Sequence, residues 1–308
     1  MRVKVHDHQG KANDLTAALK KAGAEIVTKD PEILLTDFDT AIPYYKKMVE
    51  KAYQGGAEIA LYSHGAPVIT AYDGIWEPSD KVGVYLAQSP GQKAVMEAYG
   101  YPHPISVIGW HFCKIKTFKP TEIDRVLFAP WHPHSNGYLY PMAWRLNDDV
   151  MRRLVELDYR LTVYHVGDLR YNGVREYPGV DYLPSDLSIG SAIKQIDKAD
   201  IIVTYPGTFA SLAVARGKPV VVYGQDIRPH DGYNDGMIRY VANWEAYKEL
   251  MRYPYDISDT QINATGYLLE YASKNEAEKW RNSFIGNPLD TGKLTRALEH
   301  LLGGNKDD

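Results

Sequence analysis

The stretch ADIIVTYPGTFASLAVARGKPVVVYGQD, Ala199–Asp226, decides the fold class. Its apolar run Ile201–Thr204 does not alternate in polarity, which is typical of a strand covered on both faces. A Pro-Gly turn follows, then a helix of small residues over Thr208–Arg216 and a second apolar strand over Pro219–Tyr223. A strand, a helix and a strand in this order predict a parallel sheet wrapped by helices.

The same alternation extends outward in both directions. Before the opening stretch it predicts strands Arg125–Ala129 and Leu161–Val166 and helices Asp148–Asp158 and Ser188–Lys198, with a loop rich in Gly and Pro after Val166. The first third of the chain predicts strands Arg2–His6, Glu25–Thr28, Ile33–Thr36, one ending at His64, Val82–Ala87 and Ser106–Ile108, and helices Asn13–Ala22, Tyr44–Tyr53 and Gln92–Tyr99. We therefore predict an α/β protein with two Rossmann-like domains.

A polar segment with a proline, Lys114–Glu122, separates the two alternating halves and is interpreted as the linker. The predicted parts are an acceptor-side domain over residues 1–116, a donor-binding domain over residues 117–275, and helices over residues 276–308 that return to the first domain. Ligands of open parallel sheets bind beyond the carboxyl ends of the strands. Two such domains are expected to face a central cleft.

Composition excludes several classes of protein. The formal net charge of -4 gives no global basic field for nucleic acid or an anionic membrane. A single cysteine excludes an internal disulfide framework and a cysteine-rich zinc site. No apolar run approaches the roughly 20 residues of a membrane span, and the N-terminus has no apolar signal core. We expect a cytoplasmic protein.

The turn before the predicted helix at Thr208 is suited to a phosphate. A helix N-terminus offers unpaired N–H groups and the positive end of the helix dipole. Gly207 would allow close approach, and Thr208 and Ser211 would add hydroxyl groups. No Gly-Lys-Ser/Thr follows and no G-x-G-x-x-G occurs after the first strand, so a mononucleotide phosphate is favoured over NAD. A plain strand-turn-helix packing joint is the alternative.

Two histidines follow the first strand of the second half, in FAPWHPHSNG. His132 and His134 share a face of an extended segment, and with Asn136 they are candidates to hold a pyrophosphate. A metal site lacks a clear third ligand, and an exposed polar loop is the remaining alternative. The Asp-x-Asp of TDFDT, at Asp37, is too short a pattern to establish a metal site.

The stretch LYSHG places His64 where an apolar strand ends. A histidine with a pKa near neutral is the usual general base for a hydroxyl group. Asp37 and Asp73 are candidates to orient it. A turn with a polar residue is the alternative.

The order of these pieces resembles the two-domain nucleotide-sugar transferase fold known as GT-B. Over about two thirds of the chain the sequence is similar to the CDP-glycerol glycerophosphotransferase group of teichoic acid synthesis, and more loosely to UDP-sugar 2-epimerases. The likeness rests on four segments: Ser63-His64-Gly65, Gly109-Trp110-His111, Ala129-Pro130 and Tyr205-Pro206-Gly207-Thr208. It implies that His64 is the base. The chain departs from the group at Ser63, where the group has Trp, at the group's serine pair and at the arginine of its linker turn; these departures favour a sugar over glycerophosphate.

The sequence thus predicts a glycosyltransferase that moves a sugar from a nucleotide-sugar donor, expected to be UDP-linked, to an acceptor hydroxyl, with neither metal nor resident cofactor. Gln225 and Asp226 would lie near the nucleoside or the sugar. The acceptor stays open between a glycan or polyol and a hydroxymethylated DNA base, which the net charge does not indicate. Alternatives are a CDP-glycerol-type glycerophosphotransferase, a UDP-sugar 2-epimerase-like enzyme and a non-catalytic nucleotide-binding module.

Overall fold

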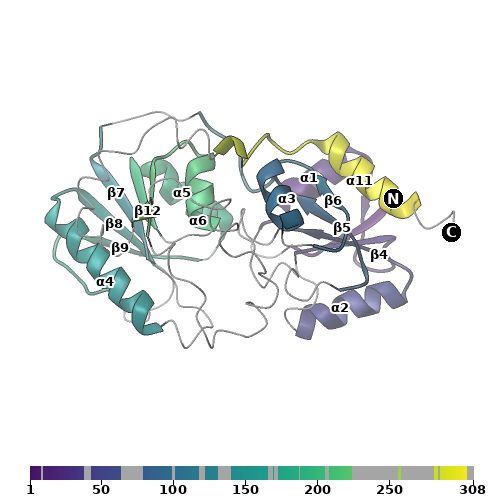
Figure 1. Cartoon of the computed structure of the whole chain (residues 1–308), viewed down its shortest axis with the longest axis horizontal. Helices are drawn as coiled ribbons and strands as arrows, with labels where there is room; N and C mark the ends of the chain where they lie inside the picture. The colour runs from purple at the N-terminus through teal and green to yellow at the C-terminus, as the bar shows by residue number, and fades with distance from the viewer. Residues whose placement is uncertain are drawn as a thin grey trace. The chain divides into compact units, whose positions relative to one another are not determined.

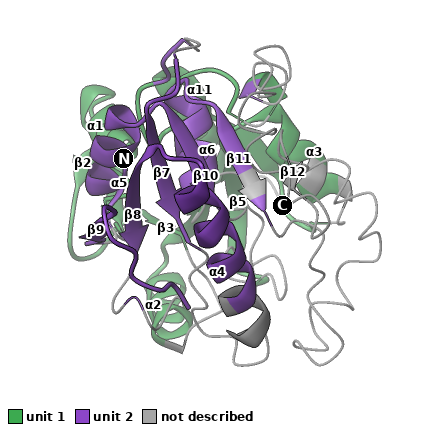
Figure 2. Cartoon of the chain, turned by 90° about the vertical axis from the view of Figure 1, so that its left-hand side faces the viewer, with its two compact units in different colours: residues 1–114, 239–251, 282–308 green, residues 115–238, 252–281 purple. Residues whose placement is uncertain are grey.

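A computed structural model describes residues 1–7, 10–37, 43–63, 79–98, 101–117, 122–130, 140–165, 169, 173–186, 188–204, 208–223, 256–257, 281–283 and 285–303. The chain divides into two compact units (Figure 2). The first comprises Met1–Lys114, Arg239–Met251 and Asn282–Asp308, and the second comprises Ile115–Ile238 and Arg252–Arg281. The acceptor-side and donor-side roles, and the cleft, stay predictions.

The first unit is built on a parallel sheet with the strand order β2-β1-β3-β4-β5-β6. Its strands are β1 (Arg2–Val5), β2 (Glu25–Ile26), β3 (Ile33–Thr36), β4 (Glu58–Tyr62), β5 (Val82–Ala87) and β6 (Ile105–Val107). The residues of β3 are all buried, as expected for a strand covered on both faces.

Among its described residues this unit has the helices α1 (Asn13–Lys21), α2 (Pro43–Gln54), α3 (Pro90–Ala98) and α11 (Thr291–Gly303). The last of them, yellow in Figure 1, packs beside α1 and against β4, β5 and β6. Leu294 and Leu298 of α11 join the buried core with Leu15 and Leu19 of α1. The C-terminal helix therefore completes the core that the N-terminal residues begin.

The second unit repeats the plan with the strand order β12-β11-β10-β7-β8-β9, again parallel throughout. Its strands are β7 (Arg125–Ala129), β8 (Arg160–His165), β9 (Asp181–Pro184), β10 (Ile201–Thr204), β11 (Val220–Tyr223) and β12 (Asp256–Ile257), and its helices are α4 (Tyr140–Glu156), α5 (Ile189–Lys198) and α6 (Thr208–Ala215). Strands β7, β8 and β10 supply the centre of the core, which α4 covers with Leu146, Val150, Met151 and Leu154. Two parallel α/β sheets confirm the predicted fold class.

Each sheet has one point where the strand order reverses. In the first sheet the chain builds β2 on one side of β1 and then β3 on the other. In the second, β8 and β9 extend from one side of β7, and β10 then returns to its other side. Ligands of open α/β sheets bind outside the carboxyl ends of the strands at such switch points. Ligand sites are therefore expected at the ends of β1 and β3 and at the ends of β7 and β10.

Several predicted bounds shift by one or two residues, and three elements differ more strongly from the sequence-based prediction. Helix α4 begins at Tyr140 and not at Asp148, because a proline in the first turn, here Pro141, is compatible with a helix. Strand β9 lies in the segment predicted as a loop, and β12 was not predicted. Both lie at sheet edges, where Pro184 can end a strand without removing a required hydrogen bond.

No helix within the described ranges is long and apolar enough to cross a membrane.

Candidate functional site

The predicted site residues divide sharply by where they fall. Thr208 and Ser211 lie among the described residues. The others lie outside them: His64, His132, His134, Asn136, Gly207, Gln225 and Asp226. Their roles stay predictions.

Helix α6 begins at the switch point of the second sheet. Strand β10 ends at Thr204, whose Oγ1 donates a hydrogen bond to the carbonyl oxygen of Ala129 at 2.9 Å and so joins the ends of the two strands at the reversal. Thr208, four residues on, opens α6 and is partly exposed, whereas Ser211 is fully buried one turn later. The first turn of α6, with the partly exposed Thr208, therefore forms the polar end of an otherwise apolar, buried helix.

The switch point of the first sheet carries an imidazole and a carboxylate. His6 follows β1 and Asp37 follows β3, and His6 Nδ1 lies 3.6 Å from Asp37 Oδ1. The Asp37 side chain is fully buried, while the His6 side chain keeps 21% of its surface exposed. The end of the first sheet therefore carries a buried carboxylate next to a partly exposed imidazole.

Two tyrosines of α2 complete this cluster. The ring of Tyr45 meets the His6 ring edge-on, with centroids 4.8 Å apart, and Tyr44 lies 5.4 Å from Tyr45. Burial, followed by the negative charge of Asp37, raises the pKa of Tyr45 to about 12. Tyr45 therefore stays a neutral phenol and is no proton acceptor at physiological pH. Tyr44 is 63% exposed and presents a ring at the rim of the cluster.

The end of β4, immediately before His64, is fixed by a buried amide network. Gln92 Nε2 donates to Ser63 Oγ at 2.9 Å, and Gln92 Oε1 accepts from the Gln88 N–H at 2.9 Å. Ser89 Oγ accepts from the Gln92 N–H at 3.1 Å. These buried bonds tie the start of α3 to Ser63 at the end of β4.

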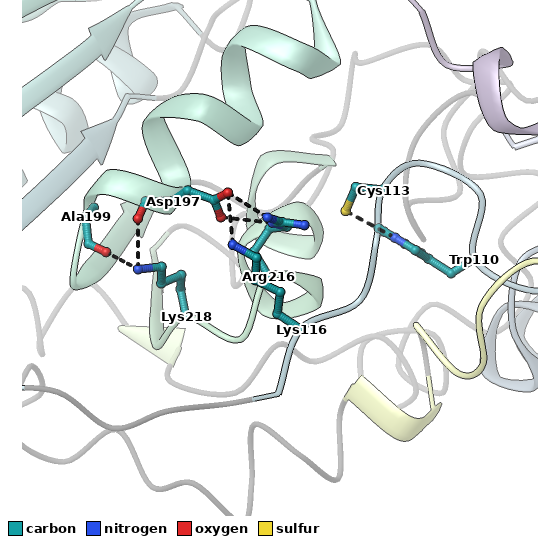
Figure 3. A network of polar contacts seen from close by, with 7 residues as sticks. All are labelled: Trp110, Cys113, Lys116, Asp197, Ala199, Arg216 and Lys218. Atoms are coloured by element: carbon teal, nitrogen blue, oxygen red, sulfur yellow. Dashed lines mark hydrogen bonds and ion pairs between the residues drawn. The ribbon is translucent and has the colours of Figure 1, made fainter.

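His111 lies deep in the first unit and is unsuited to acid–base work. It is 1% exposed, stacks on Phe112 with ring centroids 4.2 Å apart, and meets Tyr62 edge-on at 5.7 Å. Burial lowers the pKa of His111 to about 3, although its contact with the Gly109 backbone opposes the shift. Next to it, the Trp110 indole N–H donates to Cys113 Sγ at 3.4 Å (Figure 3).

This burial predicts acid sensitivity. Unfolded His111 takes up a proton below about pH 6.5, whereas the folded imidazole resists protonation down to about pH 3. The unfolded chain therefore binds more protons in that window, and stability is lost as pH falls through it. We expect the free energy of unfolding in urea to fall between pH 7 and pH 5 by about 2 kcal/mol more for the wild type than for His111→Gln. His300→Gln, on the exposed face of α11, is the control, and parallel losses in wild type and His111→Gln would contradict the prediction.

No group of three or more His, Cys, Asp or Glu side chains suited to a metal occurs within the described part of the chain. Metal independence stays a prediction.

Sequence reasoning missed His6, Tyr44 and Tyr45. The available signal was His6 at the end of RVKVH, but its partner Asp37 lies 31 positions further on. Only the adjacency of β1 and β3 brings the two together.

No protein-family model matches this sequence, and no curated protein matches it either. Among solved structures, the wall teichoic acid polymerase TagF (H548A) has a TM-score of 0.55 at 10% identity, covering 100% of this chain and 90% of that one. The glycosyltransferase SnogD from Streptomyces nogalater has a TM-score of 0.51 at 11% identity, covering 97% and 98%.

Other similar structures are longer than this chain. TarM has a TM-score of 0.48 at 14% identity; the matched region covers 93% of this chain and 57% of TarM. The matched share of the GtfA/B structure is 60%. At these identities the likeness concerns the fold alone. Two Rossmann-like parallel sheets in this order give the chain the GT-B architecture.

Proposed function

We propose that this protein is a glycosyltransferase that moves a sugar from a nucleotide-sugar donor to an acceptor hydroxyl. One observation carries the proposal: helix α6 begins at the switch point of the second sheet, with its N–H groups and Thr208 at the carboxyl edge. That position suits a nucleoside diphosphate. The GT-B architecture supports the same reading.

The donor would bind through its diphosphate at the start of α6. Thr208 and the first-turn N–H groups would hold the phosphate oxygens, and the helix dipole would stabilise the charge that develops on the leaving diphosphate without a metal. The remaining proposed donor contacts are Gly207, Ser211, His132, His134, Asn136, Gln225 and Asp226. We infer a UDP-linked sugar.

The chemical step is a displacement at the anomeric carbon. The acceptor oxygen forms the new bond to that carbon, the bond from the carbon to the phosphate oxygen breaks, and its electron pair leaves with the nucleoside diphosphate. His64 would take the acceptor proton and release it to solvent. His6, with Asp37 beside it, is the alternative base among the described residues.

The first test is a thermal-shift panel with UDP, GDP, CDP, TDP and ADP. We expect UDP to raise the melting temperature, because a ligand at about a hundred times its dissociation constant adds roughly 2.7 kcal/mol. Thr208→Val should reduce the shift, since it removes a hydroxyl group at the phosphate end of α6. Thr295→Val, a hydroxyl lost from α11 in the first unit, should leave the shift unchanged.

If none of the five nucleotides raises the melting temperature of the wild type, the donor site is misassigned. If Thr208→Val keeps the full shift in melting temperature, the phosphate does not bind at the start of α6.

A second candidate function is favoured by the likeness to TagF, whose name describes a wall teichoic acid polymerase. A CDP-glycerol-type glycerophosphotransferase would bind CDP or CMP in place of UDP, and it would release CMP. Stabilisation by cytidine nucleotides alone would establish this alternative. An epimerase would turn over its nucleotide sugar with no acceptor, and a binding module would tolerate the loss of His64.

A further inference from the structure

An ionic cluster in the second unit gathers three basic side chains around Asp197, in the last turn of α5 (Figure 3). Arg216 makes a two-pronged contact with the carboxylate, with Nε to Oδ1 at 2.9 Å and Nη2 to Oδ2 at 2.6 Å. Lys116 Nζ lies 3.1 Å from the same Oδ2. Arg216, followed by Lys116, lowers the pKa of Asp197 although burial opposes the shift. The carboxylate of Asp197 is therefore ionised at physiological pH.

Lys218 closes the cluster from the other side. Its Nζ donates to the backbone carbonyl oxygens of Ala199 and Asp197, the latter at 3.3 Å. These carbonyl groups lie at the C-terminal end of α5, where a cation complements the helix dipole. Arg216 keeps 10% of its side chain exposed and Asp197 keeps 30%, so their ion pair is partly shielded from water, unlike a fully exposed surface pair.

The cluster fixes the C-terminal end of α6. Arg216 follows α6 directly, and the carbonyl oxygen of Ala215, the last residue of the helix, accepts a hydrogen bond from the Lys116 N–H at 2.7 Å. Arg281 Nη1 donates to the Lys116 carbonyl oxygen at 3.1 Å. Lys116 alone thus links three parts of the unit: α6, α5 and the segment that contains Arg281.

Helix α6 is short and stiff enough to carry that constraint to its other end. Its eight residues span about 12 Å, and the side chains of Ala210–Ala215 are almost entirely buried. It packs against α5, β10 and β11. A close-packed helix moves as a unit, so a displacement of its C-terminal end is transmitted to Thr208.

We propose that the Asp197–Arg216–Lys116 cluster positions α6 so that its N-terminus meets the donor diphosphate. These are positioning residues: they lie at the opposite end of the helix from Thr208 and touch no substrate. The inference rests on the proposed function, because it assigns the diphosphate to α6. It predicts that breaking the cluster weakens binding of the phosphates and spares binding of the nucleoside.

The test compares each nucleoside diphosphate with its nucleoside by calorimetric titration: UDP with uridine, and likewise for GDP, CDP, TDP and ADP. Asp197→Asn keeps the side-chain shape and removes the charge that holds Arg216. We expect its affinity for the diphosphate that the wild type binds to fall about tenfold, the range for a lost charge-assisted contact. Its affinity for the matching nucleoside should be unchanged.

Two further variants separate positioning from general loosening. Glu156→Gln removes the Arg153–Glu156 ion pair of α4, at 2.7 Å, and should leave both affinities unchanged. Arg216→Lys keeps the positive charge but loses the two-pronged contact with Asp197. It should show the same selective loss of affinity for the diphosphate. It also replaces Asp197→Asn as the test variant if Asp197→Asn does not fold. The double variant Asp197→Asn/Thr208→Val should lose less diphosphate binding free energy than the two single variants lose together, because both substitutions act on the same phosphate contacts.

The outcomes distinguish the two proposals. Suppose that the wild type binds a diphosphate and the variants either keep that affinity or lose affinity for diphosphate and nucleoside equally. This result overturns the inference about the cluster and leaves the proposed function intact. A wild type that binds none of the five diphosphates overturns both.

Discussion

Gly109→Ala is expected to destabilise the protein by about 3 kcal/mol or more and to lower its melting temperature by about 5 °C. Gly109 has a φ of 97°, which side chains disfavour, and a Cβ there would lie 2.4 Å from the carbonyl oxygen of Pro288. That oxygen belongs to the backbone and cannot move alone. The hydrogen bonds from Trp110 N to Asn287 O at 2.8 Å and from Leu289 N to Trp110 O at 3.0 Å are the first that such a shift would break.

Two other glycines calibrate this result in urea or thermal unfolding. Gly179 has a φ of 80° and open space around its Cα, so Gly179→Ala measures the backbone strain alone, about 1 kcal/mol. Gly190, in α5, has neither constraint, and Gly190→Ala should stabilise slightly because alanine favours a helix. Equal losses for Gly109→Ala and Gly179→Ala would show that the Pro288 contact relaxes freely.

His64→Gln is expected to lower the rate of sugar transfer by about 10²–10⁴-fold, the usual contribution of a general base. Donor affinity should be unchanged, because the proposed diphosphate site lies on the other sheet. The measurement is release of UDP from UDP-glucose and UDP-N-acetylglucosamine with a panel of hydroxyl acceptors, beside the calorimetric affinity for UDP. Added imidazole should partly restore the rate of His64→Ala, which a purely structural role would not allow.

His6→Gln is the decisive comparison for this base, and His300→Gln is the control that should keep the full rate. If His64→Gln keeps its rate while His6→Gln loses it, the base is His6 with Asp37 beside it. If both variants keep the full rate of sugar transfer, neither histidine is the general base.

The fold was largely predictable because its strands are short, apolar and covered on both faces. Ile201–Thr204 and Arg125–Ala129 were predicted with the bounds that the structure has. The errors arose where local signals conflict with tertiary context. Pro141 reads as a loop residue, yet it is harmless in the first turn of α4. Strand β9 begins with an aspartate and ends in a proline, residues that are rare in strands, so its own sequence carries little β-signal.

The candidate site was predictable only in part. Placing functional side chains at strand ends led to Thr208 at the start of α6 and singled out Asp37. It did not connect Asp37 with His6, because the order of strands in a sheet depends on long-range pairing that no local pattern encodes. Asp37 was considered as a partner for His64; the structure finds His6 3.6 Å away, and the orientation of His64 stays a prediction.

The packing of α11 has a consequence for how the protein is made. Leu294 and Leu298 complete the core of the first unit, and Leu301 fills the space above Gly83 of β5. A ribosome that adds 5–20 residues per second would emit α11 roughly 10 to 35 seconds after Lys114. During that interval the part of the N-terminal sheet that α11 covers, at β4, β5 and β6, stays exposed, while the second unit already has most of its strands. The unit that is synthesised first is therefore the one that finishes folding last, and a stalled or truncated chain would expose this face to chaperones and to aggregation.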